Sequence, residues 1–204
     1  YTLEDTTLTV QSSLHVGKAG WGEFYPYRSD VTVKRDMVVG TDATAEGYCD
    51  IDDSNLVVKG ETRVADHGYG FFSNCDSHTT PKLVIGSHSD ANGDYIMDDA
   101  AELLAVSGET IVGRLGAGRL EQWAGLHDVN TLVIAGDPGP DRGHESVGRY
   151  DLHGGELRSF VTYLGQEGEG VFNQTGGGGA IHRATHLLLG NTGFHLGNAS
   201  GTYN

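Results

Sequence analysis

The chain has 204 residues, enough for one sizeable domain or for an array of small repeats. Twenty-eight acidic against thirteen basic residues give a formal net charge of −15, which repels phosphate backbones and anionic lipid. The composition therefore argues against a nucleic-acid partner, and no window of roughly 18 apolar residues predicts a membrane span. Two cysteines allow at most one internal disulfide and exclude a four-cysteine zinc site.

Glycine and short apolar runs dominate the pattern. Thirty-two glycines fall at intervals along the chain, which predicts many tight turns. The apolar runs are short and rich in β-forming residues, as in VTV at 31–33, TLVI at 131–134 and VTYL at 161–164. We therefore expect an all-β protein in which helix is scarce.

The predicted strands recur at a constant spacing from the N-terminus onward. Each is a hydrophobic triplet that runs into a glycine. These triplets end at Gly17, Gly40, Gly86, Gly113, Gly136, Gly165 and Gly190, and Asp66 fills the remaining place. The mean interval is roughly 25 residues, which is typical of solenoids, propellers and repeat arrays.

The copies alternate between two loop types. A short glycine-rich turn follows Gly17, Gly113 and Gly165, whereas a longer loop follows Gly40 and Gly136. The longer loops end in Gly-x-Tyr or a relative of it, so the repeating unit is a pair of coils of about 50 residues. We therefore expect one domain, 1–204, made of double repeats at approximately 1–48, 49–94, 95–149 and 150–204.

One coil of this length cannot bury its inner face alone. We expect about eight coils, each of roughly 25 residues, to stack as a parallel β-solenoid (β-helix), with alternate side chains inward. The predicted inward positions are Leu3, Leu8, Val10, Val16, Phe24, Val33, Val39, Ile51, Leu56, Phe72, Ile85, Leu120, Leu152, Phe172 and Leu188. A β-propeller-like array is the alternative, because about 50 residues also fit one four-stranded blade.

Three loops share a Gly-x-x-Gly-x-Gly frame that begins at Gly17, Gly113 and Gly165. A dinucleotide-binding loop of this kind needs a flanking strand, helix and acidic residue, which the sequence does not supply. We therefore interpret the frame as a corner of the coil, where backbone sterics demand glycine.

The segment 154–204 contains the units Gly-Gly-x-Leu, Leu-Gly, Gly-x-Gly-x-Phe-Asn-Gln-x-Gly-Gly and Ser-Gly-Thr-Tyr-Asn. These units resemble those of large bacterial exported repeat proteins, the autotransporter-passenger and PEP-CTERM-associated β-solenoids. The resemblance fades toward the N-terminus, where FYPYRSD and FFSNCDS stand in place of the FNQTGG pattern. It implies a secreted or cell-surface solenoid with a structural or adhesive role, and it supplies no catalytic residue.

Acidic residues suggest calcium at two places. The run Asp90, Asn92 and Asp94, followed by Asp98, is rich in the oxygen ligands that calcium prefers. Acidic residues also follow the first strand of successive coils, where stacking places carboxylates close together. The alternative is a solvated acidic edge that keeps the rod soluble, and no cofactor is required for the fold.

Other residues carry weaker signals. Cys49 and Cys75 lie about one coil apart, which suits a disulfide between coils, although they occupy different positions in the repeat. Asn173 and Asn198 begin N-glycosylation sequons. We expect the ten histidines, including the His182 and His186 pair, to be scattered over the surface.

The first and last coils share one phase of the repeat, because Tyr1 fits the frame that ends at Tyr203. The sequence shows no capping segment at either end, and exposed strand edges tend to pair with other chains. The residues expected at the stacking ends are Tyr1, Leu3, Leu8, Leu196 and Tyr203. We therefore expect a non-enzymatic extracellular structural protein that stacks head to tail into a surface fibre, or forms part of a longer adhesin-like rod.

The alternative is a polysaccharide-binding module or a polysaccharide-degrading enzyme that acts on surface glycans. Its groove would be lined by the aspartates and by Trp21, Tyr25, Tyr27 and Trp123. The loop 136–145 adds acidic residues and a histidine, the groups that acid–base work on a sugar requires.

Overall fold

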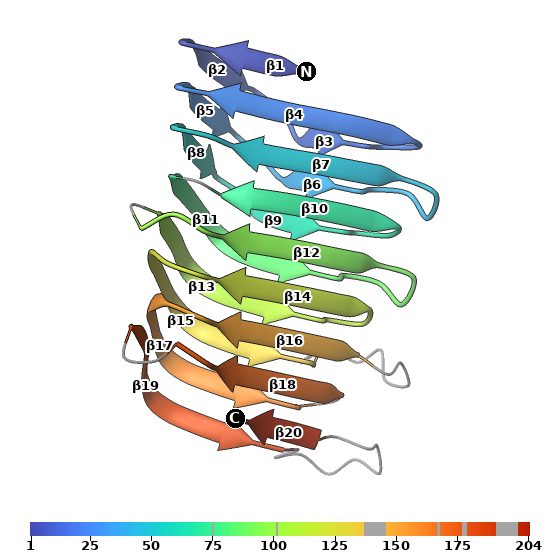
Figure 1. Cartoon of the computed structure of the whole chain (residues 1–204). Helices are drawn as coiled ribbons and strands as arrows, with labels where there is room; N and C mark the ends of the chain where they lie inside the picture. The colour runs from blue at the N-terminus through green and yellow to red at the C-terminus, as the bar shows by residue number, and fades with distance from the viewer. Residues whose placement is uncertain (75, 101, 137–145, 167, 177–178, 191–199) are drawn as a thin grey trace.

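A computed structural model describes the chain except for residues 75, 101, 137–145, 167, 177–178 and 191–199. The described residues form parallel strands and no helix, and they wind as a stack of coils. Figure 1 shows the first strand, β1, and the last strand, β20, at opposite ends of this stack. The predicted all-β parallel solenoid is therefore confirmed, and the propeller alternative is wrong.

One side of the solenoid is a sheet of nine strands, to which each coil contributes one strand. Its members, in spatial order, are β1 (Thr2–Glu4), β4 (Trp21–Tyr27), β7 (Glu46–Ile51), β10 (Tyr69–Asn74), β12 (Asn92–Met97), β14 (Ala117–Gln122), β16 (Val147–Leu152), β18 (Glu169–Gln174) and β20 (Ser200–Tyr203). One glycine per strand, from Gly22 to Gly201, lies in the same register across β4 to β20. The spacing of these glycines agrees with the predicted turn of roughly 25 residues.

The other side is a sheet of eleven strands. In the first coils it consists of short strand pairs: β2 (Thr7–Val10) with β3 (Leu14–Val16), β5 (Asp30–Val33) with β6 (Met37–Val39), and β8 (Asn55–Val58) with β9 (Glu61–Val64). In later coils each pair merges into one long bent strand: β11 (Ser77–Ile85), β13 (Leu103–Val112), β15 (Leu126–Ile134), β17 (Gly155–Leu164) and β19 (Ala180–Leu189).

The recurring glycines form a corner where two stretches of backbone touch. Gly113 has φ +72°, a conformation that side chains rarely allow. Gly118, on the strand that follows, faces this corner, and a Cβ on it would lie 2.3 Å from the Gly113 nitrogen and 2.5 Å from the Ile85 oxygen. Backbone packing therefore requires glycine at the corner, as the sequence predicted, and no ligand is needed to explain it.

A column of large side chains runs through the interior beside this corner. We call it the interior aromatic column. Its members, one per coil from β4 to β20, are Phe24, Cys49, Phe72, Tyr95, Leu120, Tyr150, Phe172 and Tyr203. Neighbouring rings stack, as between Phe72 and Tyr95, whose centroids are 4.8 Å apart with an interplanar angle of 6°.

The interior also contains polar groups that recur every second coil. His78 lies between Tyr95, whose hydroxyl is 2.9 Å from Nδ1, and Thr62, whose Oγ1 is 3.1 Å from Nε2. The same arrangement returns one double repeat later, where His127 lies 2.9 Å from the Tyr150 hydroxyl and 3.0 Å from Thr110 Oγ1. In the coils around and between them, Leu56, Leu104 and Leu157 occupy the histidine position. A period of two coils is therefore present in the buried polar groups.

The predicted inward residues are nearly all buried or packed against the core. Leu188 is the exception, because it pairs with Tyr163 on the opposite face of its strand. The residue just before each glycine corner points inward, as Leu164 does, and Leu189 is its partner in the next coil. The assignment of Leu188 was wrong by one residue, since three consecutive leucines leave the phase of the strand undecided.

Candidate functional site

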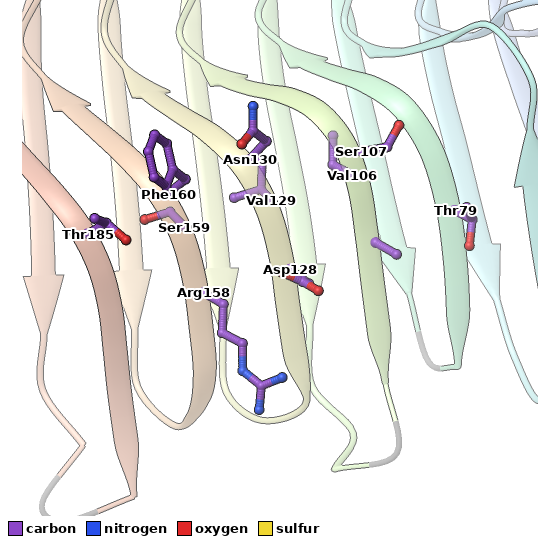
Figure 2. A pocket seen from close by; sticks show the side chains of 11 residues that line it. Thr79, Val106, Ser107, Asp128, Val129, Asn130, Arg158, Ser159, Phe160 and Thr185 are labelled. Carbon is purple, nitrogen blue, oxygen red and sulfur yellow. The ribbon is translucent and has the colours of Figure 1, made fainter.

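A shallow groove lies on the outer face of the long bent strands (Figure 2). It has a volume of about 590 Å³ and crosses β11, β13, β15, β17 and β19 near their bends. The strands bend where the pairing register shifts, for example between Val106 and Glu109 in β13. The lining residues are Thr79, Ala105, Val106, Ser107, Asp128, Val129, Asn130, Arg158, Ser159, Phe160 and Thr185.

A charged network borders the groove. Asp128 and Arg158 face each other from neighbouring strands in register. The Arg158 guanidinium donates to both carboxylate oxygens of Glu156, at 2.9 and 2.8 Å, and Arg183 donates to Glu156 Oε1 at 2.6 Å. The hydrogen bonds from Arg158 and Arg183 hold the pKa of Glu156 at about 2. These ion pairs fix the orientation of Arg158 at the edge of the groove.

The remaining lining suits a ligand rich in hydroxyl groups. Phe160 is 54% exposed although it is a large apolar ring, and Figure 2 shows it beside Ser159 and near Thr185. Hydroxyl and amide groups, together with one exposed ring, can hydrogen-bond a sugar and stack on its apolar face. Among the described lining residues Asp128 is the one carboxylate, whereas glycoside hydrolysis uses a pair. The groove geometry thus suits binding better than hydrolysis.

The aromatic residues that were expected to line a single groove lie in two places. Trp21, Tyr25 and Tyr27 share the outer face of β4. Trp123 follows β14, four strands away, where its ring stacks on His153 at 3.9 Å. None of the four lines the groove of Figure 2, and a groove formed by them stays a prediction.

The four predicted calcium ligands do not converge. Asp90 precedes β12 and its Oδ1 lies 2.7 Å from His67 Nδ1, which lowers the pKa of the Asp90 carboxyl. Asp94, on β12, accepts a hydrogen bond from the Tyr69 hydroxyl at 3.2 Å. Asp98 follows the far end of this strand, and an extended chain rises about 3.3 Å per residue. The described ligands are therefore spread along the strand, and calcium binding stays a prediction.

The predicted acidic edge is present. Burial raises the pKa of Asp76, and the carboxylates of Asp53 and Asp99 in the neighbouring coils raise it further. Beside this edge lies Glu102, which is 2% exposed, and its Oε1 accepts the backbone N–H groups of Asp98 and Asp99. Burial raises the pKa of Glu102 to about 8 in spite of these two hydrogen bonds. A pKa of about 8 favours the protonated form of Glu102 at neutral pH.

A second acidic group, which the sequence did not reveal, consists of Glu121, Asp151 and His153. Their potential ligand atoms all lie within 4.8 Å of one another. Arginine side chains already neutralise both carboxylates, because Arg119 pairs with Glu121 and Arg149 donates to Asp151 at 2.6 Å. Burial alone would raise the pKa of Asp151, but the hydrogen bonds that it accepts outweigh burial and lower it. A metal ion here would have to displace the guanidinium groups.

Two histidines that were expected on the surface are interior. His78 and His127 are fully buried, and burial lowers the pKa of each to about 3. His182 is half-buried against Phe172, and its pKa falls to about 4 for the same reason. His186 is exposed on the groove side, next to Phe160. His182 and His186 therefore point to opposite sides of β19 and do not form a metal pair.

The remaining predicted sites are partly described. Cys49 is a free thiol buried in the interior aromatic column, and its predicted partner Cys75 lies outside the described residues. The Asn173 side chain donates to Asp151 at 2.7 Å and accepts from Asn204 at 2.9 Å, so the Nδ2 atom that would carry a glycan is already engaged with Asp151. Asn198, Leu196 and residues 137–145 of the 136–145 loop also lie outside the described residues.

The groove was missed because its residues share no motif. Thr79, Ala105, Asp128 and Arg158 form one outward register across four strands, yet they differ in every property. The one available signal was Phe160, a large apolar residue at an outward position of an alternating strand. Only the pairing register brings these side chains together.

Within the described residues no helix is long and apolar enough to cross a membrane. Comparison of the chain with protein-family models, with curated proteins and with solved structures finds no match.

Proposed function

We propose that this chain is an extracellular structural protein, a β-solenoid whose ends stack on further coils to build a surface fibre or a longer rod. The proposal rests on one observation, the exposed rings at both ends of the interior column. Tyr1 stacks on Phe24 and is 73% exposed, while Tyr203 stacks on Phe172 and is 39% exposed. In every coil between these ends, the corresponding side chain is buried.

The last described long strand supports the same proposal. Leu187 and Leu189 of β19 are 42% and 54% exposed, and Leu189 occupies the inward position before the glycine corner, because no described coil covers this strand. An open apolar end of this kind is unfavourable in water, and one further coil would bury it. A coil laid on β19 in register would place Leu8 of a second copy beside His182, because both residues occupy the same inward position of their coils. Stacking of a second copy would thus put an apolar side chain against the open end of the interior.

End-to-end stacking is tested by negative-stain microscopy and sedimentation velocity over a range of concentrations. We expect filaments or a concentration-dependent increase in sedimentation coefficient for the wild-type protein, and neither for Tyr203→Asp. Phe160→Asp is the matched control, since it places the same charge at an exposed ring on the side of the solenoid and leaves assembly unchanged. Dispersed monomers of wild-type protein at high concentration would refute the fibre.

A second candidate function is glycan binding in the groove of Figure 2. The observation that favours it is the exposed Phe160 ring among hydroxyl and amide groups. We expect oligosaccharides to bind and Phe160→Ala to weaken their binding roughly fivefold, because ring stacking in such sites contributes on the order of 1 kcal/mol. A glycan array followed by calorimetry measures this. An equal affinity for the Phe160→Ala variant would remove the groove from consideration.

A further inference from the structure

The outer face of the nine-stranded sheet carries an aromatic cluster bordered by carboxylates near its N-terminal end. We call this surface the aromatic–acid face, and it is independent of the groove and of the solenoid ends. Its rings belong to Trp21 on β4, Tyr48 on β7, and Tyr69 and Phe71 on β10. Its carboxylates belong to Glu23, Glu46 and Asp94.

The strand register places the carboxylates among the rings. Glu46 lies between Trp21 and Tyr69 in one outward row, because it pairs with both on neighbouring strands. In the next row, Glu23 pairs with Tyr48. Asp94 closes this row beyond Phe71, with which it pairs. Each ring therefore has a carboxylate on an adjacent strand, at the sheet spacing of about 4.8 Å.

The rings around Tyr48 are tilted relative to its plane and do not form one flat surface. The Trp21 and Tyr48 centroids are 6.4 Å apart with an interplanar angle of 57°. Tyr69 lies 5.7 Å from Tyr48 at 56°, and Phe71 lies 6.2 Å away at 39°. Trp21 is 66% exposed and the other three rings are half-buried. Rings tilted against one another each present a face to a cation, whereas a sugar stacks on the flat face of a single ring.

The charge of this face is negative and is not compensated within the rows that form it. Its members comprise four aromatic and three acidic side chains. The next residue in the second row is Arg119, and its guanidinium pairs with Glu121 and lies near Asp151, away from the rings. The N-terminal ammonium donates to the backbone oxygen of Glu23 at 2.7 Å, and among the described side chains no arginine or lysine forms an ion pair with Glu23, Glu46 or Asp94, so a cation from another molecule can bind here.

The chain itself contains one example of the chemistry required. On the first coils of the same sheet, the Arg28 guanidinium lies over the Tyr27 ring, 4.5 Å from its centroid. The same guanidinium pairs with Asp5 at 2.6 Å and with Glu4 at 3.5 Å. A planar cation is thus held by a ring below and by carboxylates at its edge. The aromatic–acid face repeats the rings and the acids, but its seven residues include no such arginine.

We propose that the aromatic–acid face binds an arginine side chain of a partner polypeptide, with the guanidinium among Trp21, Tyr48 and Tyr69 and its N–H groups directed to Glu46. Guanidinium is favoured over ammonium because its planar shape stacks on rings while its N–H fork meets a carboxylate. The partner is an exposed basic segment, since a net charge of −15 attracts such segments from a distance.

Fluorescence of a single-tryptophan protein tests this proposal. The chain has two tryptophans, so Trp123→Phe leaves Trp21 as the reporter inside the proposed site. The probe is a hexa-arginine peptide, titrated at about 150 mM salt to screen non-specific attraction. We expect a saturable change in Trp21 emission, and a roughly three- to tenfold loss of affinity for Tyr48→Ala in the same background.

A pair of charge-matched variants separates the site from the overall charge. Glu46→Gln and Glu169→Gln each remove one exposed carboxylate from the same outward row, five strands apart. We expect only Glu46→Gln to weaken hexa-arginine, by roughly three- to tenfold. Equal losses for both variants would mean that net charge alone attracts the peptide, and the site would be rejected.

Two further probes decide the chemical source of the cation. Hexa-lysine is expected to bind several-fold more weakly than hexa-arginine, and a glucosamine hexasaccharide more weakly still. Tighter binding of the hexasaccharide, or lysine and arginine peptides that bind alike, would overturn the assignment to arginine. Since none of these measurements involves the solenoid ends, they can fail while end-to-end stacking holds, and the reverse.

Discussion

The two interior histidines make a sharp prediction about acid stability. His78 and His127 are buried and neutral, with pKa values of about 3 in the folded protein, against 6.5 for an ordinary histidine. Between these values the unfolded chain binds protons that the folded chain excludes, so the free energy of unfolding falls as the pH falls below 6.5. We therefore replace both histidines by glutamine, which is polar but does not titrate.

The expected magnitude follows from the unfolded pKa. At pH 5, protonation of the unfolded state costs about 2 kcal/mol of stability per histidine, and about 4 kcal/mol for the pair. The folded pKa hardly affects this figure, because a group with a pKa of about 3 remains neutral at pH 5 in the folded state. The loss begins near pH 7 and continues toward pH 3.

Urea unfolding followed by circular dichroism at pH 8 and pH 5 measures the effect. Between pH 8 and pH 5, the free energy of unfolding of the double variant is expected to fall by about 4 kcal/mol less than that of the wild-type protein. This difference does not depend on the stability of the variant at pH 8. His15→Gln is the control, because it removes an imidazole that is exposed and not part of the interior. If the free energy of unfolding falls by the same amount between pH 8 and pH 5 in the wild-type protein and in the double variant, the buried, neutral state of the two histidines is refuted.

Three other predictions concern buried groups. Glu102→Gln should become more stable relative to the wild-type protein as the pH rises from 4.5 to 8, because the folded pKa of about 8 makes ionisation of Glu102 costly over that window. Urea unfolding at pH 5 and pH 8 measures whether the difference in free energy of unfolding changes in this direction. Gly118→Ala should cost about 3 kcal/mol, because its Cβ meets backbone at 2.3 Å, whereas Gly179→Ala, with nothing within 4 Å, should be neutral in thermal denaturation. In a Cys75→Ser background, Cys49 should resist a thiol reagent at pH 8 until urea is added, because burial raises the pKa of its thiol; rapid labelling of the native protein would contradict this.

The repeat itself was predictable because its cause is local. Glycine at a corner such as Gly118 is demanded by the neighbouring backbone, so it recurs in the sequence wherever the corner recurs in space. The phase of most strands followed from alternation in the same way. Leu188 was misassigned because a run of three leucines has no alternation, and only pairing with Tyr163 decides its side.

The chemical surfaces were less predictable, because they depend on register between coils. Trp21 and Tyr48 belong to successive coils, and neither position alone indicates that their rings meet. The interior histidines were mistaken for surface residues because histidine is less often fully buried than apolar residues are. Their burial depends on a threonine and a tyrosine from adjoining coils, as with Thr62 and Tyr95 around His78. Such partners become visible only once the coils are aligned.

The glycine register along the nine-stranded sheet has a consequence for how the protein can change in length. Among the described strands of this sheet, each pairs only with the strand before and the strand after it, so a coil makes no pairing with distant parts of the sheet. An insertion or deletion of one whole turn leaves the corner, the rows and the register of all other turns as they were. Duplication of a segment that spans one complete turn would lengthen the molecule by one rung, whereas loss of half a turn would bring residues of one sheet into the positions of the other sheet.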